Sequence, residues 1–180
     1  MKLVILDRDG VINYDSPEYI KSPQEWHPIT GSLEAIANLH QHGFVICVAT
    51  NQAGIGRGLY SLQDLEQIHG KMLQAVTDSG GKITAVFHCP HIPDDDCQCR
   101  KPRPGLIRQI AHHLHTAVEG APLVGDKLTD IEAGIAAGCK PILVQSGSAE
   151  LTLDQLPHSD IPVYQNLAGA AAAIIAGERL

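Results

Sequence analysis

The decisive stretch of the sequence is LVILDRDG at residues 3–10, in which an apolar run leads directly into an acidic turn. Continuous apolar runs of this kind are typical of strands that are covered on both faces, as in parallel sheets. Residues two apart on an extended chain point the same way, so we expect Asp7 and Asp9 to leave the strand end together. Such a pair suits a divalent cation, or a nucleophile beside an acid/base group. The alternative interpretation is an ordinary acidic turn.

Similar apolar runs recur along the chain and alternate with stretches of helical periodicity. We expect strands at residues 3–6, 44–49, 83–87, 122–125 and 141–144. We expect helices at residues 32–42, 62–79, 104–115, 130–137 and 167–177. Repeated strand–helix–strand units predict a parallel sheet with helices packed on its faces. The expected fold class is therefore α/β, a Rossmann-like three-layer sandwich with a mainly parallel sheet.

Length and composition predict a single globular domain over residues 1–180, because 44% of the residues are apolar and only 18% are charged. The net charge of −7 argues against nucleic acid as the main partner, since such binding needs a basic surface. No apolar run approaches the roughly 20 residues of a membrane span. The first apolar run stops at Asp7, which is too early for a signal peptide. We expect a cytoplasmic monomer with no membrane partner.

Two insertions, at residues 13–29 and 89–104, interrupt the regular alternation of strands and helices. In open parallel sheets the ligand lies beyond the carboxyl ends of the strands. Both insertions leave strand ends on that side, so both should border the site. Neither is long enough to form a large cap domain, so we expect them to act as a partial lid.

Polar side chains follow the second expected strand, in the segment Thr50-Asn51-Gln52. A hydroxyl and two amides at a strand end can hold phosphate oxygens, although a helix cap or an Asx turn is an equally good interpretation. The next segment, residues 54–58, reads GIGRG and predicts a flexible loop that carries one cation, Arg57.

Charged residues also follow the fourth strand and close the second insertion. Asp126 lies directly after the strand and could complete a metal site, whereas Asp130 could brace that site or cap the next helix. Arg100 and Lys101 precede the helix at residues 104–115. Adjacent cations usually form a solvated pair, but here they adjoin a metal-type motif.

That motif has the spacing C-x-H-x₅-C-x-C and comprises Cys89, His91, Cys97 and Cys99. Three thiolates and one imidazole complete a tetrahedral Zn²⁺ site with no open position, so we interpret the site as structural. Zinc would order a loop that lacks a core of its own. It would also fix the two cations that follow Cys99.

The remaining cysteines and histidines are given structural interpretations. Cys47 and Cys139 lie in apolar segments, which predicts that they fill the core. His112, His113 and His115 share one helix with no further ligand at a compatible spacing, which predicts a solvated face.

Taken together, the motifs resemble the haloacid dehalogenase (HAD) superfamily of phosphotransferases from residue 1 to about residue 145. The ordered set is Asp-x-Asp, Thr, Lys and Gly-Asp-x-x-x-Asp. The resemblance implies that Asp7 is the nucleophile, which forms an aspartyl-phosphate, and that Asp9 is the general acid and then the base. It implies that Mg²⁺ is held by Asp7, the Asp9 main-chain carbonyl and Asp126. It also implies that Thr50 and Lys101 stabilise the transferred phosphoryl group.

The acid role places a requirement on Asp9, which must arrive protonated at the leaving oxygen. A neighbouring ionised Asp7 should raise the pKa of Asp9 and so favour the protonated form.

The Cys/His loop narrows the resemblance to the heptose 1,7-bisphosphate 7-phosphatases of nucleotide-heptose (lipopolysaccharide core) biosynthesis. The histidinol-phosphate phosphatases are a sister family that shares the loop, and they remain an alternative. Arg57 favours a bisphosphate, and both substrate anomers remain open. The resemblance implies a phosphorylated sugar substrate with contacts from Asp15, Ser16, Pro17, Glu18, Asn51, Gln52, Ala53, Arg57 and Arg100. An inactive binding module on the same fold is a further alternative, which the intact acidic set disfavours.

Overall fold

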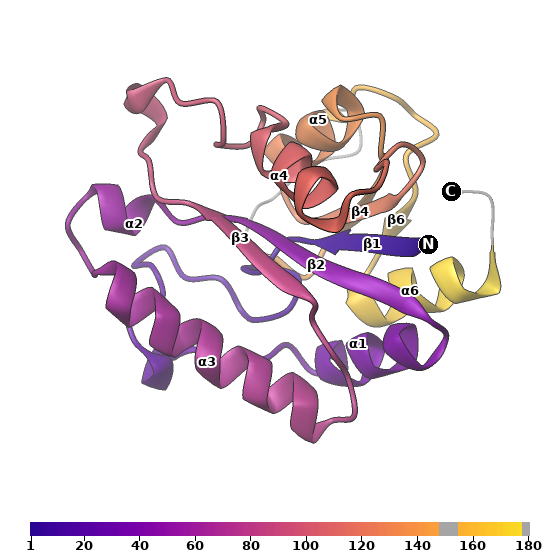
Figure 1. The fold of residues 1–180 in the computed structure, drawn as a ribbon, viewed down its shortest axis with the longest axis horizontal. Helices are drawn as coiled ribbons and strands as arrows, with labels where there is room; N and C mark the ends of the chain where they lie inside the picture. The colour runs from indigo at the N-terminus through magenta and orange to yellow at the C-terminus, as the bar shows by residue number, and fades with distance from the viewer. Residues whose placement is uncertain (148–154, 178–180) are drawn as a thin grey trace.

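The computed structural model describes residues 1–147 and 155–177 and shows one six-stranded parallel sheet between two layers of helices (Figure 1). The strand order is β3-β2-β1-β4-β5-β6. The strands are β1 Lys2–Leu6, β2 Phe44–Asn51, β3 Ala85–Cys89, β4 Pro122–Gly125, β5 Lys140–Val144 and β6 Val163–Tyr164. The α-helices are α1 Ser32–Gln41, α2 Ala53–Gly56, α3 Leu62–Asp78, α4 Gly105–Leu114, α5 Leu128–Ala136 and α6 Leu167–Ala176. Short 3₁₀ turns occur at η1 Pro23–Glu25 and η2 Pro93–Asp95.

The continuous apolar runs divide between two cores because successive strand residues face opposite sides of the sheet. In β1, Val4 and Leu6 face the core formed with α1, α3 and α6. Leu3 and Ile5 face the core formed with α4 and α5. Figure 1 shows the same division, with α1, α3 and α6 on one side of the sheet and α4 and α5 on the other. The expected α/β three-layer architecture without a large cap domain is confirmed.

Several boundaries differ from the sequence-based expectations. Residues 53–56 form the short helix α2, where we expected a flexible loop. Strand β3 runs two residues further than expected, so Cys89 ends the strand and is buried in the second core. Strand β6 was not expected, because a two-residue strand carries too little pattern to be recognised. Asp130 lies inside the first turn of α5 rather than at its N-cap.

The structural interpretations of the remaining cysteines and histidines are confirmed. Cys47 and Cys139 are buried, and His112, His113 and His115 are exposed. None of the helices in the described part of the chain is long and apolar enough to cross a membrane.

Candidate active site

The carboxyl ends of three neighbouring strands bring the expected site residues together. Strand β1 pairs with β2 on one side and with β4 on the other. Asp7 directly follows β1, Thr50 lies at the end of β2, and Asp126 directly follows β4. The Asp7 main-chain N–H donates to the Val124 carbonyl at 2.9 Å, which ties the end of β1 to β4.

A buried acidic cluster occupies this edge of the sheet. Each of Asp7, Asp126 and Asp130 offers a carboxylate oxygen, and these oxygens lie within 4.8 Å of one another. Lys101 reaches into the cluster from the second insertion, with its Nζ 2.9 Å from Asp7 Oδ1 and 2.6 Å from Asp130 Oδ1. The third ammonium hydrogen bond goes to the Ala49 carbonyl at 2.7 Å. Burial raises the pKa of Asp7 to about 6, although the Lys101 charge works in the opposite direction.

The Asp126 carboxylate is suited to a cation. It is 2% exposed, and neither of its oxygens has a hydrogen-bond partner among the described residues. Burial raises its pKa to about 8, against the opposing charge of Lys127. Two glycines make room beside it, since an added Cβ would lie 2.3 Å from Asp126 Oδ2 at Gly10 and 1.9 Å from it at Gly147. Mg²⁺ prefers carboxylate oxygens as ligands. The unpaired oxygens of Asp126, beside the carboxylates of Asp7 and Asp130, therefore fit a divalent cation.

Asp9 has a different environment from Asp7, although both follow β1. Its carboxylate accepts from the guanidinium of buried Arg8 at 2.8, 2.9 and 3.0 Å. The Asn13 and Gln52 amides each donate to it at 2.9 Å. Burial acts to raise the pKa of Asp9, but the Arg8 charge and these hydrogen bonds together hold it below its usual value. The expectation that this pKa would be raised is therefore wrong, because the Arg8 charge and the hydrogen bonds to the carboxylate outweigh burial.

Asn51 fixes the backbone of Lys101. The Asn51 side chain donates to the Lys101 carbonyl and accepts from the Lys101 N–H, both at 3.1 Å. The amide at the end of β2 thus holds the second insertion in place so that the Lys101 side chain enters the acidic cluster.

A cavity of about 350 Å³ opens beside the acidic cluster. Nine of the candidate site residues line it: Asp9, Asp15, Ser16, Pro17, Asn51, Gln52, Ala53, Arg57 and Arg100. Glu18 is exposed and is not among the lining residues. Arg57, Arg100 and Lys127 approach the cavity from three separate segments, so its wall carries three cations.

Arg8 and Lys127 were missed by sequence reasoning. Arg8 is fully buried beside Asp9, and the signal for it was a cation placed between two carboxylates in an apolar context. Lys127 forms an ion pair with Asp15 at 2.8 Å, which ties the first insertion to the end of β4. No local pattern predicts that contact, because the two residues are far apart in sequence.

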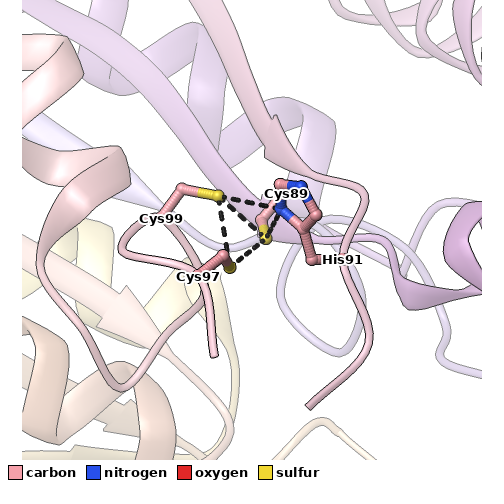
Figure 2. A group of neighbouring side chains, drawn as sticks. All are labelled: Cys89, His91, Cys97 and Cys99. Atoms are coloured by element: carbon pink, nitrogen blue, oxygen red, sulfur yellow. Dashed lines mark hydrogen bonds between the residues drawn. The ribbon is translucent and has the colours of Figure 1, made fainter. Parts of the chain in front are cut away.

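The Cys/His cluster lies at the base of the second insertion, where the four side chains point toward a common centre (Figure 2). The sulfur–sulfur distances are 3.1, 3.5 and 3.6 Å, and the His91 Nδ1 atom lies 3.3 and 3.5 Å from two of the sulfurs. A tetrahedral site with Zn–S bonds of about 2.3 Å has sulfur–sulfur edges of roughly 3.8 Å. All three thiols are free of disulfides, so the donor set fits a closed tetrahedral metal site.

The comparisons with known proteins agree with this geometry. A family model described as HAD-hydrolase-like matches residues 98–170. A Pseudomonas putida protein named D-glycero-beta-D-manno-heptose-1,7-bisphosphate 7-phosphatase is 47% identical over 175 residues, which cover 97% of this chain and 100% of that protein. The chain belongs to the heptose 1,7-bisphosphate 7-phosphatase family of HAD-like hydrolases.

Other members of the heptose bisphosphate phosphatase family extend the comparison. The crystal structure of D,D-heptose 1,7-bisphosphate phosphatase from Bordetella bronchiseptica, complexed with magnesium and phosphate, matches with a TM-score of 0.94 at 47% identity. The match covers 98% of this chain and 99% of that one. A Photorhabdus laumondii protein, named as the 7-phosphatase for the alpha form, is 36% identical over 82% of this chain and 84% of its own length. The expected place in the HAD superfamily is confirmed.

The protonation of Asp126 predicts a pH-dependent effect of Mg²⁺ on stability. The folded-state pKa of about 8 lies above the ordinary value of 3.8. The folded protein therefore retains a proton that the unfolded chain has lost, and this contribution to stability falls as the pH rises through 8. A cation replaces that proton, so the rise in Tm on adding saturating Mg²⁺ should be larger at pH 8 than at pH 5. Thermal unfolding with and without Mg²⁺ measures it.

Asp126→Asn should lose most of this pH-dependent rise in Tm, whereas Asp78→Asn, on the exposed face of α3, should keep it. Equal Mg²⁺ effects in the wild type and Asp126→Asn at pH 8 would contradict the assignment.

Proposed function

We propose that this protein is a Mg²⁺-dependent phosphatase that removes the C7 phosphate of D-glycero-β-D-manno-heptose 1,7-bisphosphate and leaves the 1-phosphate. The main support is the position of Asp7, between the Lys101 ammonium and a buried carboxylate group suited to a cation. The β anomer is favoured because the 47% identical relative carries the beta name, whereas the alpha-named relative is 36% identical. The protein acts as a cytoplasmic monomer on a soluble sugar, and its unpaired cysteines suit a reducing compartment.

The reaction divides into two phosphoryl transfers. An Asp7 oxygen attacks phosphorus, the bond from phosphorus to the C7 oxygen breaks, and Asp9 gives its proton to that oxygen. Asp9, now ionised, takes a proton from water, whose oxygen attacks the aspartyl-phosphate and frees Asp7 and inorganic phosphate. Bound Mg²⁺, held by Asp7, Asp126 and the Asp9 carbonyl, would supply positive charge to the phosphoryl oxygens. Lys101 and the Thr50 hydroxyl add donors to the same group.

Asp9 must gain a proton before the first transfer. In the structure Arg8 favours its ionised form. A phosphate dianion that enters the site opposes a second negative charge beside it, so substrate binding itself favours protonation of Asp9. The same Arg8 then stabilises the carboxylate that remains after the proton has been donated.

The cavity wall favours a bisphosphate over histidinol phosphate. Arg57 and Arg100 line the cavity beyond the acidic cluster, and they complement a second phosphate on the same substrate. Histidinol phosphate instead carries an ammonium group, which these cations would repel. The contacts of Asp15, Ser16 and Pro17 with the sugar, and of Arg100 with the remote phosphate, belong to this proposal.

We also propose that Zn²⁺ fills the Cys/His cluster and acts structurally. The cluster precedes Arg100 and Lys101, and the Arg100 guanidinium donates to the His91 carbonyl at 3.2 Å. A bound metal would therefore order the segment that delivers both cations to the site. His91 and the three cysteines leave no position open for substrate.

Substrate preference is the direct test of the proposed function. The kcat/KM for the β-heptose 1,7-bisphosphate should exceed that for the α anomer and that for histidinol phosphate, each by at least about tenfold. Released phosphate is measured under identical Mg²⁺ concentrations. Asp7→Asn is the control and should abolish turnover, because the amide cannot form the acyl-phosphate. A preference for histidinol phosphate would overturn the assignment, and a wild type without turnover would favour an inactive binding module.

Zinc content tests the structural metal. Cys97→Ser replaces a thiolate ligand with a weakly coordinating hydroxyl, so the purified protein should contain much less zinc than the wild type. It should also show a lower Tm and a raised KM, because Arg100 and Lys101 lose their support. Metal analysis and thermal unfolding measure these effects, with Cys139→Ser as the matched control outside the cluster. Full activity of zinc-free wild type would contradict the structural role.

A further inference from the structure

We propose that Gln52 is a positioning residue that holds the acid/base Asp9 and the phosphoryl-binding Thr50 in register, rather than a residue that contacts the substrate. The inference rests on the proposed function, because it assigns Asp9 and Thr50 the roles described above. It changes the interpretation of Gln52, which the family resemblance placed among the substrate contacts.

The side-chain amide of Gln52 is committed to the protein at every hydrogen-bonding position. Gln52 is 3% exposed. Its Nε2 donates to Asp9 Oδ2 and to Thr50 Oγ1, each at 2.9 Å. Its Oε1 accepts from the Tyr60 hydroxyl at 2.6 Å and from Arg8 Nη2 at 3.2 Å. An amide has two N–H donors and two acceptor lone pairs, so none remains for a substrate without breaking an existing bond.

Two donors determine which way the amide faces. Tyr60 and Arg8 both present hydrogens to Gln52, and a flipped amide would place its NH₂ group against them. The oxygen of the flipped amide would then face the Asp9 carboxylate, where two acceptors repel each other. The orientation with Nε2 toward Asp9 is therefore enforced by Tyr60, which lies just before α3, and by Arg8 in the turn after β1.

This enforced orientation has a direct chemical consequence. The Thr50 oxygen accepts from Gln52, so its single hydrogen stays available for a phosphoryl oxygen. The same Nε2 fixes one oxygen of Asp9, which must meet the leaving oxygen on the other side of the phosphorus. A misplacement of about 1 Å at such a group costs roughly 100-fold in rate. One buried amide thus sets the separation of two groups that act on the same phosphoryl group.

Gln52→Met and Gln52→Glu test the role, since both keep the length of the side chain and remove its two donors. For β-heptose bisphosphate we expect kcat to fall by about 10- to 100-fold, with KM within about twofold of the wild type. Gln74→Met, on exposed α3, is the control and should leave both constants unchanged. A raised KM with unchanged kcat would show that Gln52 contacts the substrate and would overturn the proposal.

Leaving-group dependence separates positioning of Asp9 from a general loss of structure. p-Nitrophenolate leaves without a proton, whereas phenolate benefits from one. In single-turnover experiments Gln52→Met should therefore slow phenol release from phenyl phosphate several-fold more than nitrophenolate release from p-nitrophenyl phosphate. Equal losses on both substrates would show that the role is merely structural. These probes do not depend on the heptose, so wild type that cleaves them but not heptose bisphosphate would refute the proposed function alone.

Tyr60→Phe keeps the proposal testable if the Gln52 variants fail to fold. Tyr60 does not line the cavity, and the change removes only the hydroxyl that orients Gln52. Loss of one such hydrogen bond should lower kcat by about 2- to 10-fold, with the same leaving-group pattern and an unchanged KM. Wild-type kcat in Tyr60→Phe would overturn the proposed orientation of the amide by this hydroxyl.

Discussion

The arrangement of the site depends on one constraint, which is that several carboxylates are buried together at the edge of one sheet. Asp7, Asp126 and Asp130 share a small volume, which Lys101 enters with a compensating charge. Burying unpaired charge is costly, so such a cluster is stable only with protons, cations or both. The raised pKa values of Asp7 and Asp126 are the consequence. The buried carboxylates thus need compensating positive charge at the site that is proposed to bind a phosphate dianion.

The second insertion supplies part of this positive charge from outside the sheet, through Lys101. Lys101 does not belong to a strand or helix; its backbone is held by the Asn51 amide, and the Cys/His cluster lies just before it. A loop without a core of its own would cost conformational entropy to order. Four metal-type ligands over eleven residues offer a compact way to order it. The proposed zinc site and Lys101 are therefore linked through one short peptide segment.

The sequence was sufficient to predict the first five strands, the strand-end motifs and the acidic cluster, because each depends on local pattern and on the rule that parallel strands end at one edge. The surroundings of Asp9 could not be predicted in the same way. The period-two rule assumed an extended chain through residue 9, but β1 ends at Leu6 and the chain then turns, with the Ile12 N–H bonded to the Arg8 carbonyl. The contacts of Arg8 with Gln52 and His69 also come from distant segments.

In the proposed mechanism, that turn separates two carboxylates that carry out opposite tasks. Asp7 has to be an available nucleophile, so it lies among carboxylates where a cation and Lys101 can hold it ionised. Asp9 has to exchange a proton twice, so it needs a surrounding in which the ionised form is tolerated after each donation. Arg8 provides that surrounding, since it is fully buried and forms an ion pair with Asp9 at 2.8 Å. The charges that the fold places beside each of these two neighbouring aspartates thus suit one to the proposed role of nucleophile and the other to that of acid/base.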